Sequence, residues 1–276
     1  DDNSYDEMQN ALKQAAILHD KEPEGRLVKI LTGEKKPVFH NGLSLYTNPQ
    51  LNASQQDAVN KILSANDLAI VHGPPGTVKT TTLVQAIKAL IRQDQQQILV
   101  VAPSNTAVDL LSEKLFDEGL NVLRVGNPAR VSERLMSLTL DSKMSEHSSV
   151  KEIKRLKKQA NEFRDMAHKY KRSFGKAERE QRKALFDEAR KIMKEVGNTE
   201  QYIIDDLIAK AQVITATLVG ANHYTVRNQR YHTVVIDEAG QALEPACWIP
   251  ILKAQKVVLT ADHCNVFATV KPKAGN

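Results

Sequence analysis

Short apolar runs alternate with longer amphipathic segments along most of the chain. Runs such as 98–101 and 234–236 consist of branched aliphatic residues alone, which is typical of parallel strands covered by helices on both faces. We therefore predict strands at 68–72, 97–102, 122–125, 212–216, 233–237 and 256–260. Amphipathic segments at 79–93 and 105–118 predict helices between the early strands. This order of elements indicates an α/β fold with a parallel sheet.

Two further helices are expected ahead of the first strand. Apolar residues recur at helical spacing over 5–20, and Pro23 and Gly25 end that helix. A second amphipathic run covers 55–63, where either Ser54 or Asn52 is placed to cap the helix. We expect residues 1–48 to form an N-terminal helix and linker.

The strand pattern stops between about 131 and 210. Apolar residues there follow one another at steps of three and four, which is the spacing of a coiled-coil seam: Ile153, Leu156, Ala160, Phe163, Ala167, Tyr170 and Phe174. Gly175 breaks this seam, and a second one consists of Leu185, Ala189, Ile192 and Val196. We predict an antiparallel helical hairpin that is inserted into the α/β core and closed by Gly197-Asn198.

The positive charge of the chain is concentrated in this hairpin. The net charge is +5, yet residues 151–195 contain sixteen Lys and Arg against eight Asp and Glu, so the remainder carries an excess of negative charge. Two interpretations stay open. The charges form either the solvated outer face of a coiled coil or a surface that faces nucleic acid.

The cysteines and the hydropathy of the chain bear on its location. Cys247 and Cys264 are the two cysteines, and neither has the spacing of a zinc site, which favours a reducing compartment. No apolar run approaches the roughly 20 residues of a membrane-spanning helix, and no signal peptide opens the chain. We expect a cytoplasmic or nuclear protein that is not secreted and has no membrane partner.

The strongest chemical signal is a glycine-rich turn between the strand at 68–72 and the helix at 79–93. In the phosphate-loop pattern G-x-x-x-x-G-K-[ST], backbone N–H groups surround the β-phosphate, the lysine meets the β- and γ-phosphates, and the hydroxyl holds Mg²⁺. We expect ATP to be bound by Gly73, Pro74, Pro75, Gly76, Thr77, Val78, Lys79, Thr80 and Thr81. Val78 replaces the second glycine, so we expect a weakened site.

An acidic pair ends the apolar strand at 233–237. Asp237 would hold Mg²⁺ together with Thr80, and Glu238 would polarise the attacking water, so Lys79, Asp237 and Glu238 are the candidate catalytic residues. The alternative is a pair of carboxylates that only stabilise a helix N-terminus. The phosphate loop in the same predicted sheet favours the nucleotide site.

Several further motifs carry a resemblance to a known family. They are Leu51-Asn52-Ala53-Ser54-Gln55, Ala102-Pro103-Ser104-Asn105-Thr106-Ala107-Val108-Asp109, Arg124-Val125-Gly126-Asn127-Pro128-Ala129-Arg130, Ala216-Thr217-Leu218-Val219-Gly220-Ala221 and Asp237-Glu238-Ala239-Gly240-Gln241. Together they resemble the first RecA-like domain of a superfamily 1B helicase, in the branch of the nonsense-mediated-decay and immunoglobulin-switch-binding helicases. The resemblance covers nearly the whole chain.

The resemblance implies a P-loop NTPase of RecA-like fold that couples ATP hydrolysis to movement on single-stranded RNA or DNA. It implies a stalk helix and linker at 1–48, a first RecA-like domain at 49–130 and 211–276, and an inserted helical subdomain at 131–210. Gln55 would read the adenine edge, and Gln241 and Asn265 would also contact the nucleotide. Nucleic acid would be bound by Ser104, Asn105, Thr106, Arg130 and Thr217, although simple capping of the helix at 105–118 also explains residues 104–106.

Three departures from the family pattern count against activity. Besides Val78, the segment 259–270 follows motif III but has Ala261 for Gly, Asn265 for Gln and Val266-Phe267-Ala268 for Leu-Pro-Pro. No residues after Asn276 supply the second RecA-like domain, and the family's β-barrel is missing. We expect a fragment or crippled form of a helicase. The leading alternative is a catalytically inactive nucleic-acid-binding or scaffolding domain, and another kind of P-loop ATPase is the least favoured.

Overall fold

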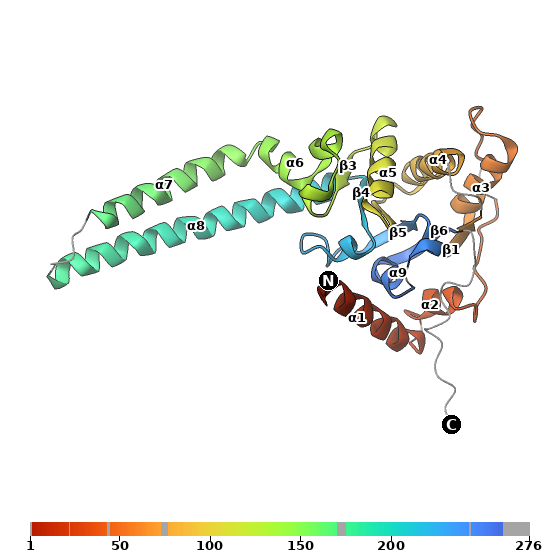
Figure 1. Cartoon of the computed structure of the whole chain (residues 1–276), viewed down its shortest axis with the longest axis horizontal. Helices are drawn as coiled ribbons and strands as arrows, with labels where there is room; N and C mark the ends of the chain where they lie inside the picture. Colours follow the sequence, from red (N-terminus) through yellow and green to blue (C-terminus); the bar gives the residue numbers. More distant parts are fainter. Residues whose placement is uncertain are drawn as a thin grey trace, which may run out of the picture. The chain divides into compact units, whose positions relative to one another are not determined.

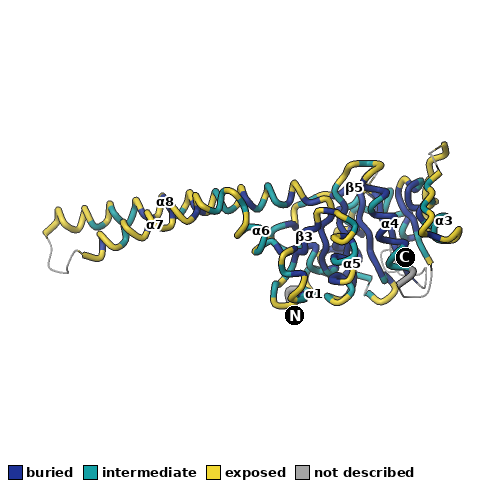
Figure 2. The backbone as a smooth tube through the Cα atoms, turned by 90° about the horizontal axis from the view of Figure 1, so that it is seen from above, coloured by how far each residue is buried: buried dark blue, intermediate teal, exposed yellow. Residues whose placement is uncertain are grey.

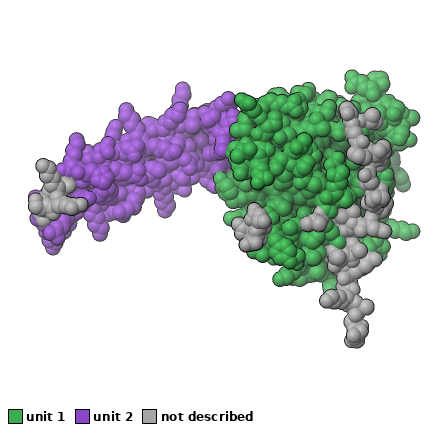
Figure 3. All heavy atoms as spheres, viewed as in Figure 1, with its two compact units in different colours: residues 1–139, 211–276 green, residues 140–210 purple. Residues whose placement is uncertain are grey.

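The structure is a computed structural model that describes residues 2–21, 23–42, 45–72, 77–169, 175–242 and 244–261, without the side chains of residues 2, 3, 77 and 78. The chain divides into two compact units (Figure 3). Unit 1 comprises residues 1–139 and 211–276, and unit 2 comprises residues 140–210.

Unit 1 is built on a parallel sheet, as predicted. In the described residues its strands are β1 (Leu68–Val71), β2 (Ile98–Ala102), β3 (Val122–Arg124), β4 (Val213–Thr217), β5 (Tyr231–Ile236) and β6 (Ala254–Thr260). They lie in the order β1-β6-β5-β2-β4-β3, and every neighbouring pair is parallel. Each strand overlaps its predicted range, so the predicted α/β fold is confirmed.

Helices cover both faces of the sheet (Figure 1). On one side are α4 (Thr77–Asp94) and α5 (Asn105–Asp117), with α3 (Ala53–Ser64) packed against α4. On the other side lie α1 (Asp2–His19) and α9 (Glu244–Ile251), while α2 (Arg26–Leu31) leads back towards β1. Short 3-10 helices are η1 (Pro128–Arg130), η2 (Glu133–Leu138), η3 (Val219–Asn222) and η4 (Ala239–Gln241).

The burial of β2 explains why its sequence is apolar throughout. Ile98, Val100 and Ala102 belong to the core cluster under α4 and α5. The intervening Leu99 and Val101 point to the opposite face and are equally buried. Figure 2 shows the strand segments of unit 1, such as β5, coloured as buried. A strand that is covered on both faces has no polar face, which is why short apolar runs locate these strands in the sequence.

Helix α1 packs on α9. Ala11 and Ala15 of α1 are buried, whereas Ile17 is 59% exposed. The apolar face of the helix therefore does not include every apolar residue between positions 5 and 20.

None of the helices in the described part of the chain combines the length and the apolar character that a membrane span needs.

Unit 2 consists of α6 (Leu140–Glu146), α7 (Val150–His168) and α8 (Lys176–Lys210). The long helices α7 and α8 run side by side (Figure 1), and the predicted seam forms their contact. Its core contains Ile153, Leu156, Ala160, Ile192, Val196 and Ile203. Tyr170 and Phe174 lie outside the described residues.

The predicted end of the hairpin at Gly197-Asn198 is wrong. Helix α8 continues without interruption to Lys210. Glycine within a helix costs about 1 kcal/mol relative to alanine, but Ile203 beyond it is fully buried in the unit 2 core. Burial of one such side chain contributes roughly 2 kcal/mol, which is enough to carry the helix through the glycine.

We therefore predict that Gly197→Ala stabilises unit 2. A methyl group on Gly197 would meet no atom within 4 Å, so the substitution removes the glycine penalty without a clash. We expect the free energy of unfolding to rise by about 0.5–1 kcal/mol, measured by urea denaturation. A fall in stability would show that the helix is irregular at this position.

Candidate functional site

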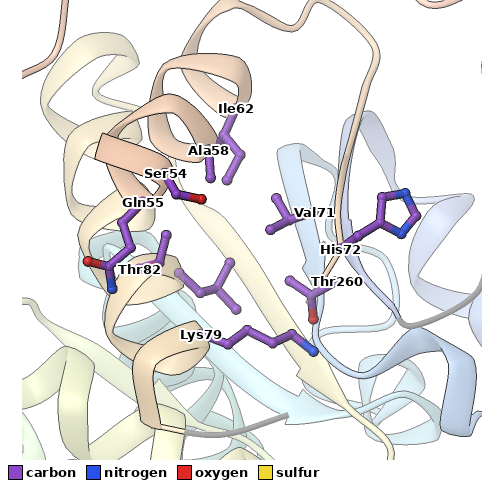
Figure 4. Close-up of a pocket in the computed structure, with 10 residues that line it drawn as sticks. Ser54, Gln55, Ala58, Ile62, Val71, His72, Lys79, Thr82 and Thr260 are labelled. Carbon is purple, nitrogen blue, oxygen red and sulfur yellow. The ribbon is translucent and has the colours of Figure 1, made fainter. Parts of the chain in front are cut away.

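A pocket lies between α3, the first turns of α4 and the carboxyl ends of β1 and β6 (Figure 4). Apolar side chains of α3 and β1 face each other across it, and polar groups complete its lining. The lining residues are Ser54, Gln55, Ala58, Ile62, Val71, His72, Lys79, Thr82, Leu83 and Thr260. The carboxyl ends of parallel strands are where α/β sheets commonly bind ligands.

Gln55 is held at the rim of this pocket by a capping box. Its backbone N–H donates to Asn52 Oδ1 at 2.9 Å, and the backbone N–H of Asn52 donates to Gln55 Oε1 at 2.8 Å. Asn52 is thus the cap of α3, which decides between the two residues that the sequence offered. The reciprocal bonds fix the orientation of the Gln55 amide beside the pocket.

Lys79 and Asp237 face each other at the other end of the pocket. Lys79 Nζ lies 3.7 Å from Asp237 Oδ1, and each side chain is about 10% exposed. Figure 4 shows Lys79 extending from α4 with its ammonium end towards Thr260. The lysine of the phosphate loop and the aspartate of the acidic pair, far apart in the sequence, therefore form a nearly buried ion pair.

Thr260 connects the acidic pair to the neighbouring strand. Its hydroxyl donates a short hydrogen bond to Asp237 Oδ1 and accepts one from the backbone N–H of Glu238 at 3.0 Å. The sequence interpretation did not assign Thr260 a role. The available signal was a threonine at the end of an apolar strand, next to a strand that ends in the acidic pair.

Glu238 has a backbone conformation that side chains rarely adopt. Its φ and ψ are 54° and 42°, in the left-handed region. Among the described non-glycine residues, only Glu238 and Gln95 have a positive φ. Such a conformation costs on the order of 1–2 kcal/mol, and conformations of this kind cluster at functional sites. Glu238 is therefore oriented by the turn that follows β5.

Not all predicted nucleotide-binding residues can be placed. Thr80 and Thr81 lie in the first turns of α4. Gly73, Pro74, Pro75, Gly76 and Asn265 fall outside the described residues, as do the side chains of Thr77 and Val78. Gln241 ends η4 and is exposed, and it is not among the described residues that line the pocket.

A second concave surface brings together residues from α1, α5, η1 and η3. It is lined by Ser4, Glu7, Asn105, Arg124, Gly126, Asn127, Arg130, Thr217, Val219, Gly220, Asn222 and His223, and we call it the polar groove. Asn105, Arg130 and Thr217, which the sequence predicted to contact nucleic acid, all line it. The Ser104 hydroxyl instead caps α5 by accepting from Ala107 N at 3.1 Å, and Thr106 is not among the lining residues.

The polar groove is built around the buried guanidinium of Arg124. This side chain donates to Asp109 Oδ1 at 3.1 Å, to Asn105 Oδ1 at 2.9 Å and to the carbonyl of Val125 at 2.6 Å. Asp109 Oδ2 in turn accepts from the backbone N–H of Ser132 at 3.0 Å. The network joins α5, β3 and the segment after η1, and it holds the Asn105 oxygen inward.

Known proteins resemble the chain along nearly its whole length. Residues 50–273 match the family described as AAA domain. DNA polymerase alpha-associated DNA helicase A of Schizosaccharomyces pombe is 34% identical over 230 residues, which are 83% of this chain and 34% of that protein. DNA-binding protein SMUBP-2 of Mus musculus is 34% identical over 273 residues, which are 95% of this chain and 26% of that protein.

A third relative is the ATP-dependent helicase upf1 of Schizosaccharomyces pombe, 32% identical over 284 residues, which are 98% of this chain and 28% of that protein. The chain thus spans about a quarter to a third of the length of these relatives. The chain belongs to the AAA domain family and is a core domain of the superfamily 1B helicases, in the branch of the nonsense-mediated-decay and immunoglobulin-switch-binding helicases.

Proposed function

We propose that the chain binds ATP in the Gln55–Lys79 pocket and single-stranded RNA or DNA in the polar groove, as the first RecA-like domain of an ATP-dependent helicase. The observation that carries this proposal is the approach of Lys79 to Asp237 and Thr260 at the end of a pocket whose rim holds Gln55. The relatives support it, since two of them are named helicases and one a DNA-binding protein.

In this proposal the adenine base occupies the apolar part of the pocket. Ala58, Ile62 and Val71 offer surfaces against which a flat ring packs. The Gln55 amide would read an edge of the adenine ring, and its oxygen accepts from the backbone N–H of Asn52. The amide geometry, fixed by the capping box, favours one edge of the base.

The phosphates of bound ATP would break the ion pair between Lys79 and Asp237. Lys79 would turn to the β- and γ-phosphates, and Asp237 would be released to hold Mg²⁺ together with the Thr80 hydroxyl. Carboxylate and hydroxyl oxygens are the donors that Mg²⁺ prefers, so these residues fit the ion. When bound, Mg²⁺ would neutralise phosphate charge, and Glu238 would accept a proton from the water that attacks the γ-phosphate.

The polar groove would bind the sugar-phosphate backbone. Arg124 holds the Asn105 oxygen, which leaves the amide N–H groups of Asn105 as the donors for a phosphate oxygen. Arg130 supplies a positive charge from the same groove, and Thr217, the last residue of β4, also lines it. None of these contacts would distinguish one base from another, as a translocating protein requires.

The unit 2 hairpin would be the family's inserted helical subdomain, for which we propose the range 131–210. Part of its charge is engaged in ion pairs along α7 and α8, such as Arg155 with Glu152 and Arg190 with Asp187. Exposed pairs of this kind contribute little to stability.

We also propose that ATP binding and turnover are impaired. Val78 would crowd the phosphates, and Asn265 is one methylene shorter than the motif III glutamine that acts on the γ-phosphate in the family. Ala261 replaces a glycine of that motif and is buried after β6. The second candidate function is a nucleic-acid-binding or scaffolding domain without ATP turnover, which the affinity for Mg·ATP would distinguish.

These 276 residues alone are expected to lack strand-stimulated ATP hydrolysis and unwinding. In the family the ATP site lies between two RecA-like domains, and arginines of the second complete it. Hydrolysis should be measured by phosphate release with and without single-stranded oligonucleotide, and unwinding with a fluorescent duplex that has a single-stranded overhang. Clear unwinding by this chain alone would overturn the proposed need for a second domain.

A further inference from the structure

An aromatic pair stands at the edge of the polar groove. The rings of His223 and Tyr224 have centroids 4.6 Å apart and planes inclined by 36°. His223 lines the polar groove, and Tyr224 is 71% exposed. A single exposed aromatic residue is common on protein surfaces. A binding role for Tyr224 therefore has to be argued from the residues around it.

Several hydrogen bonds stabilise the turn that carries the pair. The backbone N–H of His223 donates to the Gly220 carbonyl, and the His223 carbonyl accepts from the N–H groups of Val226 and Arg227, all at 2.9 Å. The His223 ring is held by the Thr225 hydroxyl at 2.6 Å. Val226 is 1% exposed and anchors the turn in the core. Tyr224 therefore projects from a turn that is held by hydrogen bonds and by a buried side chain.

Hydrogen bonds also connect the aromatic pair to Thr217, one of the proposed phosphate contacts. Thr217 Oγ1 accepts from Gly220 N at 3.1 Å, and Gly220 O accepts from His223 N. Two consecutive hydrogen bonds thus link Thr217, which is predicted to contact the nucleic-acid backbone, to His223 of the aromatic pair. A single strand with its phosphates in the polar groove would direct its bases outwards, to where an exposed ring can meet them.

We propose that Tyr224, supported by His223, is a stacking platform for one base of a single strand bound in the polar groove. The inference rests on the proposed function, since it requires a strand in that groove. Every base has a π-face, so the contact would hold the strand without selecting its sequence. It would also fix how far the strand extends across this edge of the domain.

Binding of a fluorescently labelled oligothymidylate, followed by anisotropy, tests the platform. Tyr224→Ala should weaken binding by roughly fivefold to a hundredfold, the range that loss of one base–aromatic stack produces. Tyr224→Phe keeps the ring and should bind as the wild type does. The salt dependence of binding should be the same in wild type and Tyr224→Ala, because stacking releases no counterions.

The chain offers a matched control. Phe116, near the end of α5, is 52% exposed and is not among the residues that line the polar groove. Phe116→Ala should therefore leave the affinity unchanged. A strand with abasic sites throughout should bind wild type and Tyr224→Ala equally, because no base is present to stack.

The outcomes separate the platform from the proposed function. If the wild-type chain binds no strand, the proposed function fails. If it binds, and Arg130→Gln lowers the salt slope by nearly one while Tyr224→Ala matches the wild type, the groove stands and the platform is wrong. Equal losses with Tyr224→Phe and Tyr224→Ala, or the same loss on the abasic strand, would also overturn the platform.

Discussion

Replacing Val78 with glycine should strengthen Mg·ATP binding by about a hundredfold. Position 78 lies in the first turn of α4, where the backbone is helical, so valine is not excluded by its φ angle. In our proposal valine adds volume where the loop would approach the phosphates. If that volume prevents two charge-assisted hydrogen bonds, its removal recovers roughly 3 kcal/mol, which is about a hundredfold in affinity.

Two further variants show whether the gain comes from the phosphate site. Val78→Ala removes most of the side chain and should give an intermediate affinity. Lys79→Ala, added to the glycine variant, should abolish most of the gain, because we propose Lys79 as the charged partner of the phosphates. Calorimetric titration measures all four proteins. The impaired loop is ruled out if the wild type already binds Mg·ATP at micromolar strength and glycine makes no difference.

Replacing Arg124 with methionine should destabilise unit 1 by about 3–5 kcal/mol. Arg124 is 2% exposed and Asp109 8%, and they form a hydrogen-bonded ion pair. Removing one partner of a buried pair leaves the other charge without compensation, which is the costly case. The free energy of unfolding, from urea denaturation, measures the effect.

The double variant Arg124→Met/Asp109→Leu provides the control. It removes both charges, so it should recover a substantial part of the stability lost in Arg124→Met. Strand binding should not recover, because Asn105 would still lack the donor that orients its amide. If Arg124→Met unfolds with a free energy within about 1 kcal/mol of the wild type, the network does not hold the groove together.

The sheet could be predicted from sequence because its strands are buried on both faces. Such strands have no polar positions, and Ile98 to Val101 and Val234 to Ile236 stand out as uninterrupted apolar runs. The hairpin seam was equally visible, since Ile153, Leu156 and Ala160 follow helical spacing. Its end was mispredicted because a local signal, Gly197, was outweighed by burial of Ile203 further along α8.

The polar networks could not be predicted, because their members come from separate elements. Arg124 contacts Asp109 and, through it, Ser132, and no local pattern joins these positions. An arginine inside the apolar run of β3 was the one available sign that a buried charge needed a partner. Thr260 is similar, since its bonds to Asp237 and Glu238 depend on the pairing of β5 with β6.

The location of the nucleotide site is tested most directly by nuclear magnetic resonance, which detects binding even when it is weak. The ¹⁵N-labelled wild-type chain is titrated with Mg·ATP into the millimolar range. Our account predicts that the amide signals of Gln55, Lys79, Thr82 and Thr260, which surround the pocket, shift together along one saturation curve, and that Lys79→Ala abolishes the shifts. No change at these amides, or saturable shifts confined to other parts of the chain, would contradict the proposal that this pocket binds ATP.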